Sequence, residues 1–280
     1  FAQLDSGDFK TGLAQLESAI ETQKELVAYD SKTATWQFDL SRSYTRAGDG
    51  YIYTGALDDG IARYEEALAL RQKLAARDPK SVPYKRSLAF SFAKLGQAFT
   101  EKATVPRAIE SHEQALALRE KLVEGSPTQI MYRNELATTE IALGRLLATR
   151  DAKRAETLIA SGLTRARAVA TSDPINLEWK ETVLQGLLAT AEQMRDPKVK
   201  RATLDEAIAI AFEAITRSPQ NIHWPGYLAE THAALALLAP DAKARTAAWQ
   251  AALNALEPLA AAGRLPATRK TLLDRARASR

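Results

Sequence analysis

The stretch from residue 78 to residue 125 reads DPKSVPYKRSLAFSFAKLGQAFTEKATVPRAIESHEQALALREKLVEG, and its landmarks recur along the whole chain. A large aromatic residue follows a turn signal in each copy, at spacings of 48, 48, 47 and 45 residues: Trp36, Tyr84, Tyr132, Trp179 and Trp224. Ser or Pro stands five residues before each aromatic, and Gly or Ala stands twelve residues after it. A register that holds across five copies is the sequence signature of a solenoid.

Within one copy, apolar residues follow the period of an α-helix twice. The first stripe steps by three or four residues through Trp36, Leu40, Tyr44, Gly48 and Tyr51. After a break at 54–55, a second stripe follows at the same period: Leu57, Ile61, Tyr64, Ala67 and Leu74. Each copy is therefore predicted to form two antiparallel helices of about 15–20 residues, and the register predicts that Trp179 is a buried anchor between helices.

The punctuation of the chain sets the expected boundaries. Asp-Pro or Ser-Pro pairs mark the turns between copies, and polar residues two positions later offer N-caps: Thr33, Ser81, Gln129, Asn176 and Asn221. We expect one continuous solenoid, divided into a half repeat at 1–29, repeats at 30–77, 78–125, 126–172, 173–217 and 218–262, and a basic capping helix at 263–280. Because a solenoid needs a cap over its apolar end, the half repeat predicts further protein before Phe1.

The small residues at fixed places have a packing reason. Glycine inside a helix costs about 1 kcal/mol relative to alanine, so its recurrence needs a compensating gain. Gly96 and its counterparts are predicted to mark places where two helices cross closely.

Composition excludes several classes of function. The 280 residues include no Cys, which rules out disulfides, thiolate catalysis, and zinc or iron–sulfur sites held by cysteine. The sequence contains no run of about 18 apolar residues, which is the length needed to span a membrane. Residues 241–280 hold eight basic and three acidic residues, a net charge of +5. This basic end offers a hypothetical contact with nucleic acid, but a capping helix is the favoured interpretation, so we do not expect a nucleic-acid partner.

No group of residues has the pattern of a catalytic or cofactor site. The three histidines, His112, His223 and His232, lack the i, i+4 spacing of a helical metal site, and His223 is expected to be solvated in a junction. The sequence Gly48-Asp49-Gly50 follows a helix and lacks the phosphate-loop pattern. We therefore expect no catalytic residue, no metal and no cofactor in this segment.

The spacing of the helix pairs resembles that of a tetratricopeptide (TPR) array. The resemblance rests on two series, Tyr44, Ala47, Gly48, Tyr51, Gly55, Leu57, Gly60, Tyr64 and Ala67, and then Phe92, Leu95, Gly96, Phe99, Ala108, His112 and Ala115. The units of 45–48 residues are longer than the family's usual 34. Similar long units resemble arrays attached to bacterial serine/threonine kinases, signalling NTPases and transcription regulators. The resemblance implies an all-α right-handed superhelix of antiparallel helix pairs.

The resemblance also implies a binding surface. In TPR proteins, the first helix of each pair lines a concave groove that holds a peptide or a partner helix. Carried over by position, the candidate lining is Arg42, Thr45, Asp49, Tyr53, Phe90, Gln97, Glu101, Thr138, Ile141, Arg145, Gln185, Glu192 and Arg195. Thr45 and Asp49 stand where chaperone-binding members carry a Lys/Asn clamp, so that clamp is absent.

Two hypotheses about function follow from this resemblance. The first is a non-catalytic protein–protein interaction module, the scaffold or sensor of a larger bacterial signalling protein, with a protein or peptide as partner. The alternative is the regulatory C-terminal arm of a serine/threonine kinase or signalling NTPase whose catalytic domain lies upstream.

Overall fold

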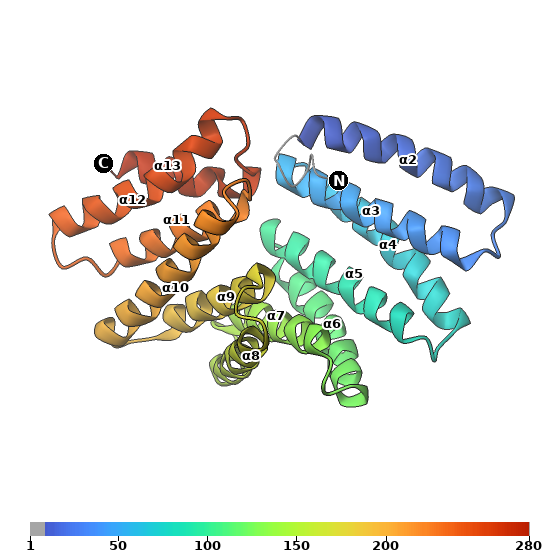
Figure 1. Cartoon of the computed structure of the whole chain (residues 1–280), viewed down its shortest axis with the longest axis horizontal. Helices are drawn as coiled ribbons and strands as arrows, with labels where there is room; N and C mark the ends of the chain where they lie inside the picture. Colours follow the sequence, from blue (N-terminus) through green and yellow to red (C-terminus); the bar gives the residue numbers. More distant parts are fainter. Residues whose placement is uncertain (1–8, 280) are drawn as a thin grey trace.

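Figure 1 shows a computed structural model in which residues 9–279 are described; residues 1–8, part of the expected half repeat, and Arg280 lie outside that range. The first helices of the pairs are α3 (Ala34–Thr54), α5 (Val82–Glu101), α7 (Ile130–Leu147), α9 (Leu177–Gln193) and α11 (His223–Ala236). The second helices are α2 (Phe9–Tyr29), α4 (Leu57–Arg77), α6 (Val105–Gly125), α8 (Ala152–Ser172), α10 (Pro197–Arg217) and α12 (Ala242–Ala261). The short helices η1 (Ala267–Arg269) and α13 (Lys270–Ala278) complete this part of the chain.

Each helix packs against the one before it and the one after it, and residues 9–279 contain no β-strand. The chain is therefore an all-α solenoid of helix pairs in a TPR-like arrangement, as the period of its apolar residues predicts. On the outer helix α4, Asp58 and Asp59 lie in the first turn, where acidic side chains favour the helix dipole.

The predicted N-caps have mixed outcomes. The side chains of Ser81 and Asn176 cap α5 and α9, since they accept bonds from the backbone N–H groups of the third residue beyond each. Thr33 and Gln129 occupy N-cap positions without a side-chain bond. Asn221 is one residue early: Ile222 is the N-cap of α11, although the Asn221 side chain still accepts a bond of 2.8 Å from the backbone N–H of His223.

The crossing glycines are confirmed. A Cβ at Gly48 would lie 2.5 Å from the ring of Tyr64, and a Cβ at Gly96 would lie 2.6 Å from the ring of His112. Real Cβ atoms essentially never come this close to another heavy atom. In both pairs the second helix places a ring directly over the glycine of the first helix.

A buried arginine links neighbouring helix pairs. Arg71 on α4 is 3% exposed and donates to the Ser41 hydroxyl (3.1 Å) and the Ser91 hydroxyl (2.7 Å), on α3 and α5. Burial lowers the pKa of its guanidinium to about 10. Arg119 repeats this arrangement 48 residues later by donating to Thr139. Ala89 replaces the first serine there, and the Nε of Arg119 has no hydrogen-bond partner among the described residues.

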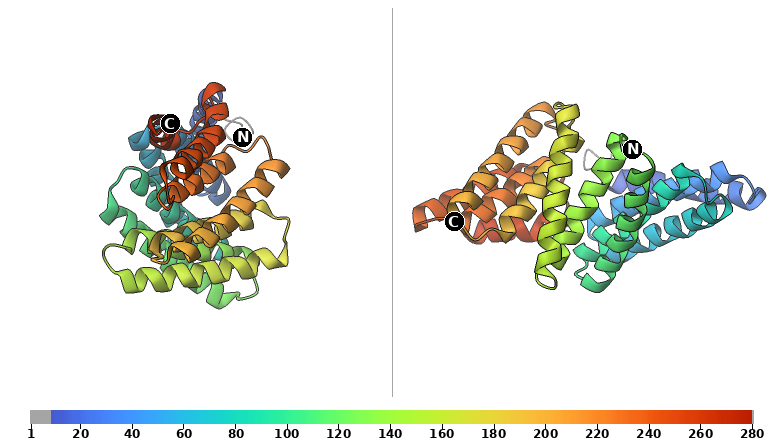
Figure 2. Two further views of the ribbon diagram at one scale, coloured as in Figure 1. Left: turned by 90° about the vertical axis from the view of Figure 1, so that its left-hand side faces the viewer. Right: turned by 90° about the horizontal axis from the view of Figure 1, so that it is seen from below.

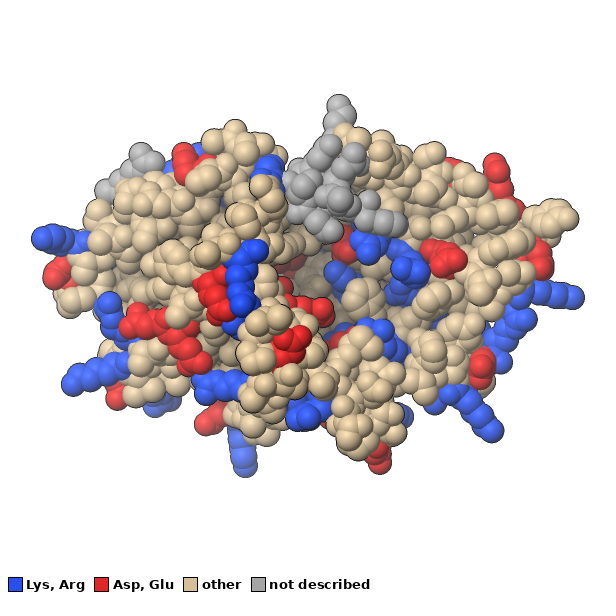
Figure 3. All heavy atoms as spheres, viewed as in Figure 1, with Lys and Arg blue, Asp and Glu red and all other residues tan. Residues whose placement is uncertain are grey.

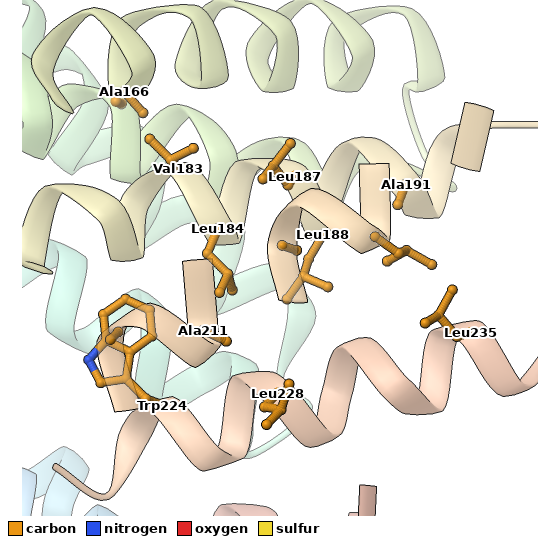
Figure 4. Close-up of a cluster of buried hydrophobic side chains, with 14 residues drawn as sticks. Ala166, Val183, Leu184, Leu187, Leu188, Ala191, Ala211, Trp224, Leu228 and Leu235 are labelled. Carbon is orange, nitrogen blue, oxygen red and sulfur yellow. The ribbon is translucent and has the colours of Figure 1, made fainter. Parts of the chain in front are cut away.

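The largest core cluster lies between α8 and α11. Figure 4 shows Leu184, Leu187 and Leu188 of α9 between Ala166 of α8 and side chains of α10 and α11. The buried face of α10 consists of Leu204 and three alanines, Ala207, Ala211 and Ala214, whose small side chains let the neighbouring helices approach closely.

The prediction that Trp179 is a buried anchor between helices is wrong, because Trp179 is only partly buried. Of the five repeat aromatics, only Trp224 is buried. Trp224 is 2% exposed and packs within this cluster, with its ring 6.0 Å from that of Tyr227. Trp36, Tyr84, Tyr132 and Trp179 are only partly buried. All five aromatics lie in the first turn of a first helix, so their position along the helix does not explain the difference in burial.

The superhelix curves until its two ends meet. In the right-hand view of Figure 2, the helices follow one another in chain order along the array. Figure 1 shows the inner ends of α2 and α3 close to the inner ends of α11 and α12 and to the segment that follows them, and η1 contacts α3. Ile222, at the start of α11, is 1% exposed because it packs in a cluster with Phe9 and Tyr44 of the N-terminal helices. Ala267 of η1 lies against Gly55, whose positive φ of 87° ends α3. These contacts close the array around its centre.

Candidate functional site

The first helices face the centre of the superhelix, where they line a cavity of about 750 Å³ that is open to solvent. Side chains of α3, α5, α7, α9, α11 and η1 line it, together with two rings that reach through from second helices, Tyr64 and His112. Figure 3 shows the molecule hollowed near its centre, with charged side chains of both signs around the hollow. Thus nearly every helix pair contributes to one central site.

The candidate groove residues divide into two groups. Eight of them line the cavity: Asp49, Tyr53, Gln97, Glu101, Ile141, Arg145, Gln185 and Glu192. Five are outside its lining: Arg42, Thr45, Phe90, Thr138 and Arg195.

The five candidates outside the lining either make contacts away from the cavity or are exposed. Thr45 is buried and donates to the Ser41 carbonyl inside α3, and Arg42 is exposed, 3.6 Å from Asp39. Phe90 lies under the cations of Arg71 and Lys94. The Thr138 hydroxyl lies 3.4 Å from that of Thr182, and Arg195 is exposed beyond the end of α9. A position on a first helix is therefore not sufficient for a place on the cavity wall.

On one side of the cavity, the carboxylate of Asp49 accepts hydrogen bonds from two side chains. Asp49 accepts from the Tyr64 hydroxyl at 2.6 Å and from the Lys94 ammonium at 2.8 Å. Burial, and then the charge of Asp49, raise the pKa of Tyr64 well above its usual value, so this phenol stays protonated and donates. Asp49 and Lys94 balance each other in charge.

Two arginines and two glutamates form a chain across the opposite side. Arg145 of α7 lies 2.6 Å from Glu192 of α9 and 3.2 Å from Glu230 of α11. Arg269, from η1, reaches Glu230 at 3.1 Å. Burial alone would lower the pKa of Arg145, but the two glutamates outweigh it and raise that pKa. This network ties three first helices to the C-terminal segment.

Glu181 belongs to a third group, which is without a cation. The Tyr227 hydroxyl donates to it at 2.7 Å, and the Gln185 amide donates to both of them, at 3.2 Å to Glu181 and 2.8 Å to Tyr227. Burial, followed by the charge of Glu181, raises the pKa of Tyr227 well above its usual value. Glu181 therefore remains an acceptor that two neutral donors hold in place.

Glu101 and His112 also line the cavity, and each has polar atoms without a hydrogen-bond partner among the described residues. Glu101 has no hydrogen bond or ion pair there; loss of water around it raises its pKa, and Arg269 acts in the opposite direction. His112 is 2% exposed, and its Nδ1 has no hydrogen-bond partner. Burial lowers the pKa of His112 to about 4, so the imidazole is neutral at pH 7.

His223 departs from its expected place in solvent. Its Nε2 lies 3.3 Å from the Tyr53 hydroxyl, and the two rings are 5.5 Å apart. Because this contact joins α3 to α11, the histidine belongs to the closure of the superhelix and to the wall of the cavity.

The lining also contains residues that the sequence analysis missed. Glu230 could have been found by continuing the register of Gln185 for 45 residues, into the fifth copy. Arg269 could not, because it lies beyond the last repeat and reaches the cavity only through the curvature of the whole array.

Within residues 9–279, no group of three or more His, Asp or Glu side chains is placed to hold a metal ion. In the same part of the chain, no helix has the length and apolar character needed to cross a bilayer.

Comparison with known proteins shows likeness in fold only. No protein-family model matches the chain, and no curated protein matches it. The crystal structure of BtubC (BKLC) from P. vanneervenii aligns over 97% of this chain and 90% of that one, with a TM-score of 0.54 and 16% identity. TTC0263, a thermophilic TPR protein in Thermus thermophilus, aligns over 85% of this chain and 98% of that one, with a TM-score of 0.44 and 18% identity.

Proposed function

We propose that this helical array is a non-catalytic protein–protein interaction module that binds a short segment of a partner at its centre. The observation that carries the proposal is the convergence of five first helices on one cavity with a mixed polar and apolar wall. Such a surface offers hydrogen bonds, ion pairs and apolar contacts to a peptide.

The size of the cavity favours a short peptide segment over a long helix. An α-helix has a diameter of about 10 Å and rises about 5.4 Å per turn, so two turns fill roughly 850 Å³. The cavity of about 750 Å³ is therefore suited to a few residues. The same site would serve the alternative suggested by the sequence, the regulatory arm of a kinase or signalling NTPase, since such an arm also needs a recognition surface.

A peptide-display selection tests the proposal. Peptides selected on the wild-type protein should bind at least tenfold more weakly to Gln97→Trp and Ala142→Trp, which add bulk to the cavity wall. Lys73→Trp and Glu156→Trp are matched controls, because both residues are exposed on outer helices away from the cavity. If the selected peptides bind the cavity variants as well as they bind the wild type, the concave site is not the binding surface.

A further inference from the structure

A second pocket, of about 280 Å³, lies between the last two helix pairs and α13. Leu188, Ala191 and Leu204 line it from α9 and α10, and these residues belong to the largest core cluster. Trp249 and Leu272 line it from α12 and α13, and they pack in the cluster of the last pair. Protein interiors leave few voids larger than a water molecule, so an apolar gap of this size between two clusters is a candidate binding site.

The pocket opens where α11 ends. The first helices become shorter along the chain, from 21 residues in α3 to 17 in α9 and 14 in α11. Leu237 directly follows the last residue of α11, lines the pocket and is 75% exposed. In the register of the copies, the place of the buried residues Phe99 and Leu147 falls on Ala239, beyond the end of α11. The fifth copy therefore has a small side chain where earlier copies have a large one that fills the core.

The wall of this pocket suits a hydrocarbon chain better than a peptide. Apart from four charged residues, its side chains are those of Leu, Ala and Trp, and it offers no hydroxyl or amide group. A peptide would bring N–H and C=O groups, and burying them without hydrogen-bond partners costs free energy. A hydrocarbon chain has no such groups. Since an apolar cavity of about 150 Å³ binds benzene, a pocket of nearly twice that volume holds roughly eight to ten carbon atoms.

The charged residues of the wall favour an anionic end on that chain. Its two glutamates already belong to the ion-pair network of the central cavity. Its two cations, Lys200 and Arg275, have no carboxylate within ion-pair distance among the described residues. The Arg275 guanidinium lies 5.5 Å from the centre of the Trp249 ring, which places its charge beside the apolar wall. A carboxylate at these cations would be attracted more strongly than in bulk water, because the wall excludes water on one side.

We infer that this second pocket binds a medium-chain fatty carboxylate, with its chain among Leu188, Leu204 and Leu237 and its carboxylate at Lys200 and Arg275. The inference goes beyond the proposed function, because a fatty carboxylate in this pocket neither requires nor excludes a peptide in the central cavity. Its test uses no selected peptide, so the two can fail separately.

Calorimetric titration of the full chain with octanoate tests the inference, and 1-octanol and butyrate separate the contributions of the chain and of the charge. Lys200→Gln with Arg275→Gln removes the two cations; neither residue is fully buried, so this variant should fold as the wild type does. Lys73→Gln with Arg150→Gln is the matched control, because both residues are exposed, lie outside the pocket and make no ion pair among the described residues. Ala233→Phe adds bulk to the wall of the pocket.

The expected result is one octanoate per chain, with 1-octanol and butyrate each bound at least tenfold more weakly. Octanoate should bind the variant without the two cations at least tenfold more weakly, whereas 1-octanol should bind it as it binds the wild type. The control variant should bind octanoate unchanged, and Ala233→Phe should bind neither octanoate nor 1-octanol. If Ala233→Phe does not fold, the variant without the two cations decides.

Three results would overturn the inference. The first is no binding of octanoate, or binding of several molecules per chain. The second is octanoate binding that is unchanged in the variant without the two cations or in folded Ala233→Phe, since the ligand would then lie elsewhere. The third is tighter binding of acetyl-Ala-Ala-Leu, a peptide with a free carboxylate and an apolar last side chain, because the pocket would then recognise the end of a protein chain.

Discussion

At the scale of single residues, His112 shows how one side chain fills a place that the sequence register defines. Its ring lies over Gly96, as the ring of Tyr64 lies over Gly48 in the preceding copy. A tyrosine there reaches its acceptor, Asp49, whereas the Nδ1 of the histidine has no hydrogen-bond partner among the described residues. The two copies share a shape and differ in their polar partners.

The low pKa of His112 predicts a loss of stability in acid. The pKa of about 4 in the folded protein lies below the usual value of 6.5, so the unfolded chain binds the proton more tightly. The contribution of His112 to the free energy of unfolding is complete above pH 6.5 and is lost as the pH falls towards 4. The difference between these two pKa values corresponds to about 3 kcal/mol of unfolding free energy. Urea unfolding from pH 7 to pH 4 measures it.

The matched variant for this measurement is His112→Tyr, which copies the arrangement of Tyr64. It should fold and should lack the part of the pH dependence that the histidine contributes, while the contribution of the carboxylates remains. Equal pH dependence in the two proteins would show that His112 is protonated as readily in the folded chain as in the unfolded one.

At the scale of helices, burial separates residues that share one register position. Trp224 and Trp179 occupy the same place in their copies, but Trp224 is 2% exposed within the core of α9, α10 and α11, and Trp179 is only partly buried. Trp224→Ala should destabilise the protein by about 3–5 kcal/mol. Trp179→Ala should destabilise the protein clearly less, because the Trp179 side chain is only partly buried. Urea midpoints of the two variants, with Trp224→Phe as a conservative control, rank them. A larger loss for Trp179→Ala would contradict the assignment of burial.

The different burial of Trp224 and Trp179 shows which features of the fold could be predicted from the sequence and which could not. The period of three to four residues depends on local packing, so it predicts the helix pairs and the crossing at Gly96 correctly. The burial of an aromatic depends on how the next pair closes over it, and a register shared by both copies carries no information about that. The same applies to the cavity: the register placed Gln97 and Arg145 on its wall, but it also included Arg42 and Thr45, which face elsewhere.

At the scale of the whole molecule, the closure between the two ends is the feature that turns a curved surface into a cavity. It joins residues 170 positions apart, such as Tyr53 and His223. Nothing in a repeat register reports such a contact, because each repeat in a solenoid contacts mainly its neighbours and the curvature accumulates over all of them. Arg269 reaches the wall for this reason alone.

Removing the closing contacts should open the array without unfolding it. Ile222→Ala with His223→Ala takes away the buried contact between the ends and the bond to Tyr53. Since solenoid stability is roughly a sum over neighbouring repeats, the urea midpoint should change little while the radius of gyration from small-angle scattering increases. The opposite pattern is expected for Leu204→Ala, a fully buried residue of α10 within the core between neighbouring pairs, which should lower the midpoint and leave the radius unchanged. If the double variant behaves as Leu204→Ala does, Ile222 stabilises only its own helix pair and the ends are not held together by it. If it opens as expected, ligands of the cavity should also bind it more weakly, because Tyr53, His223 and Arg269 would no longer face the other helices across a closed site.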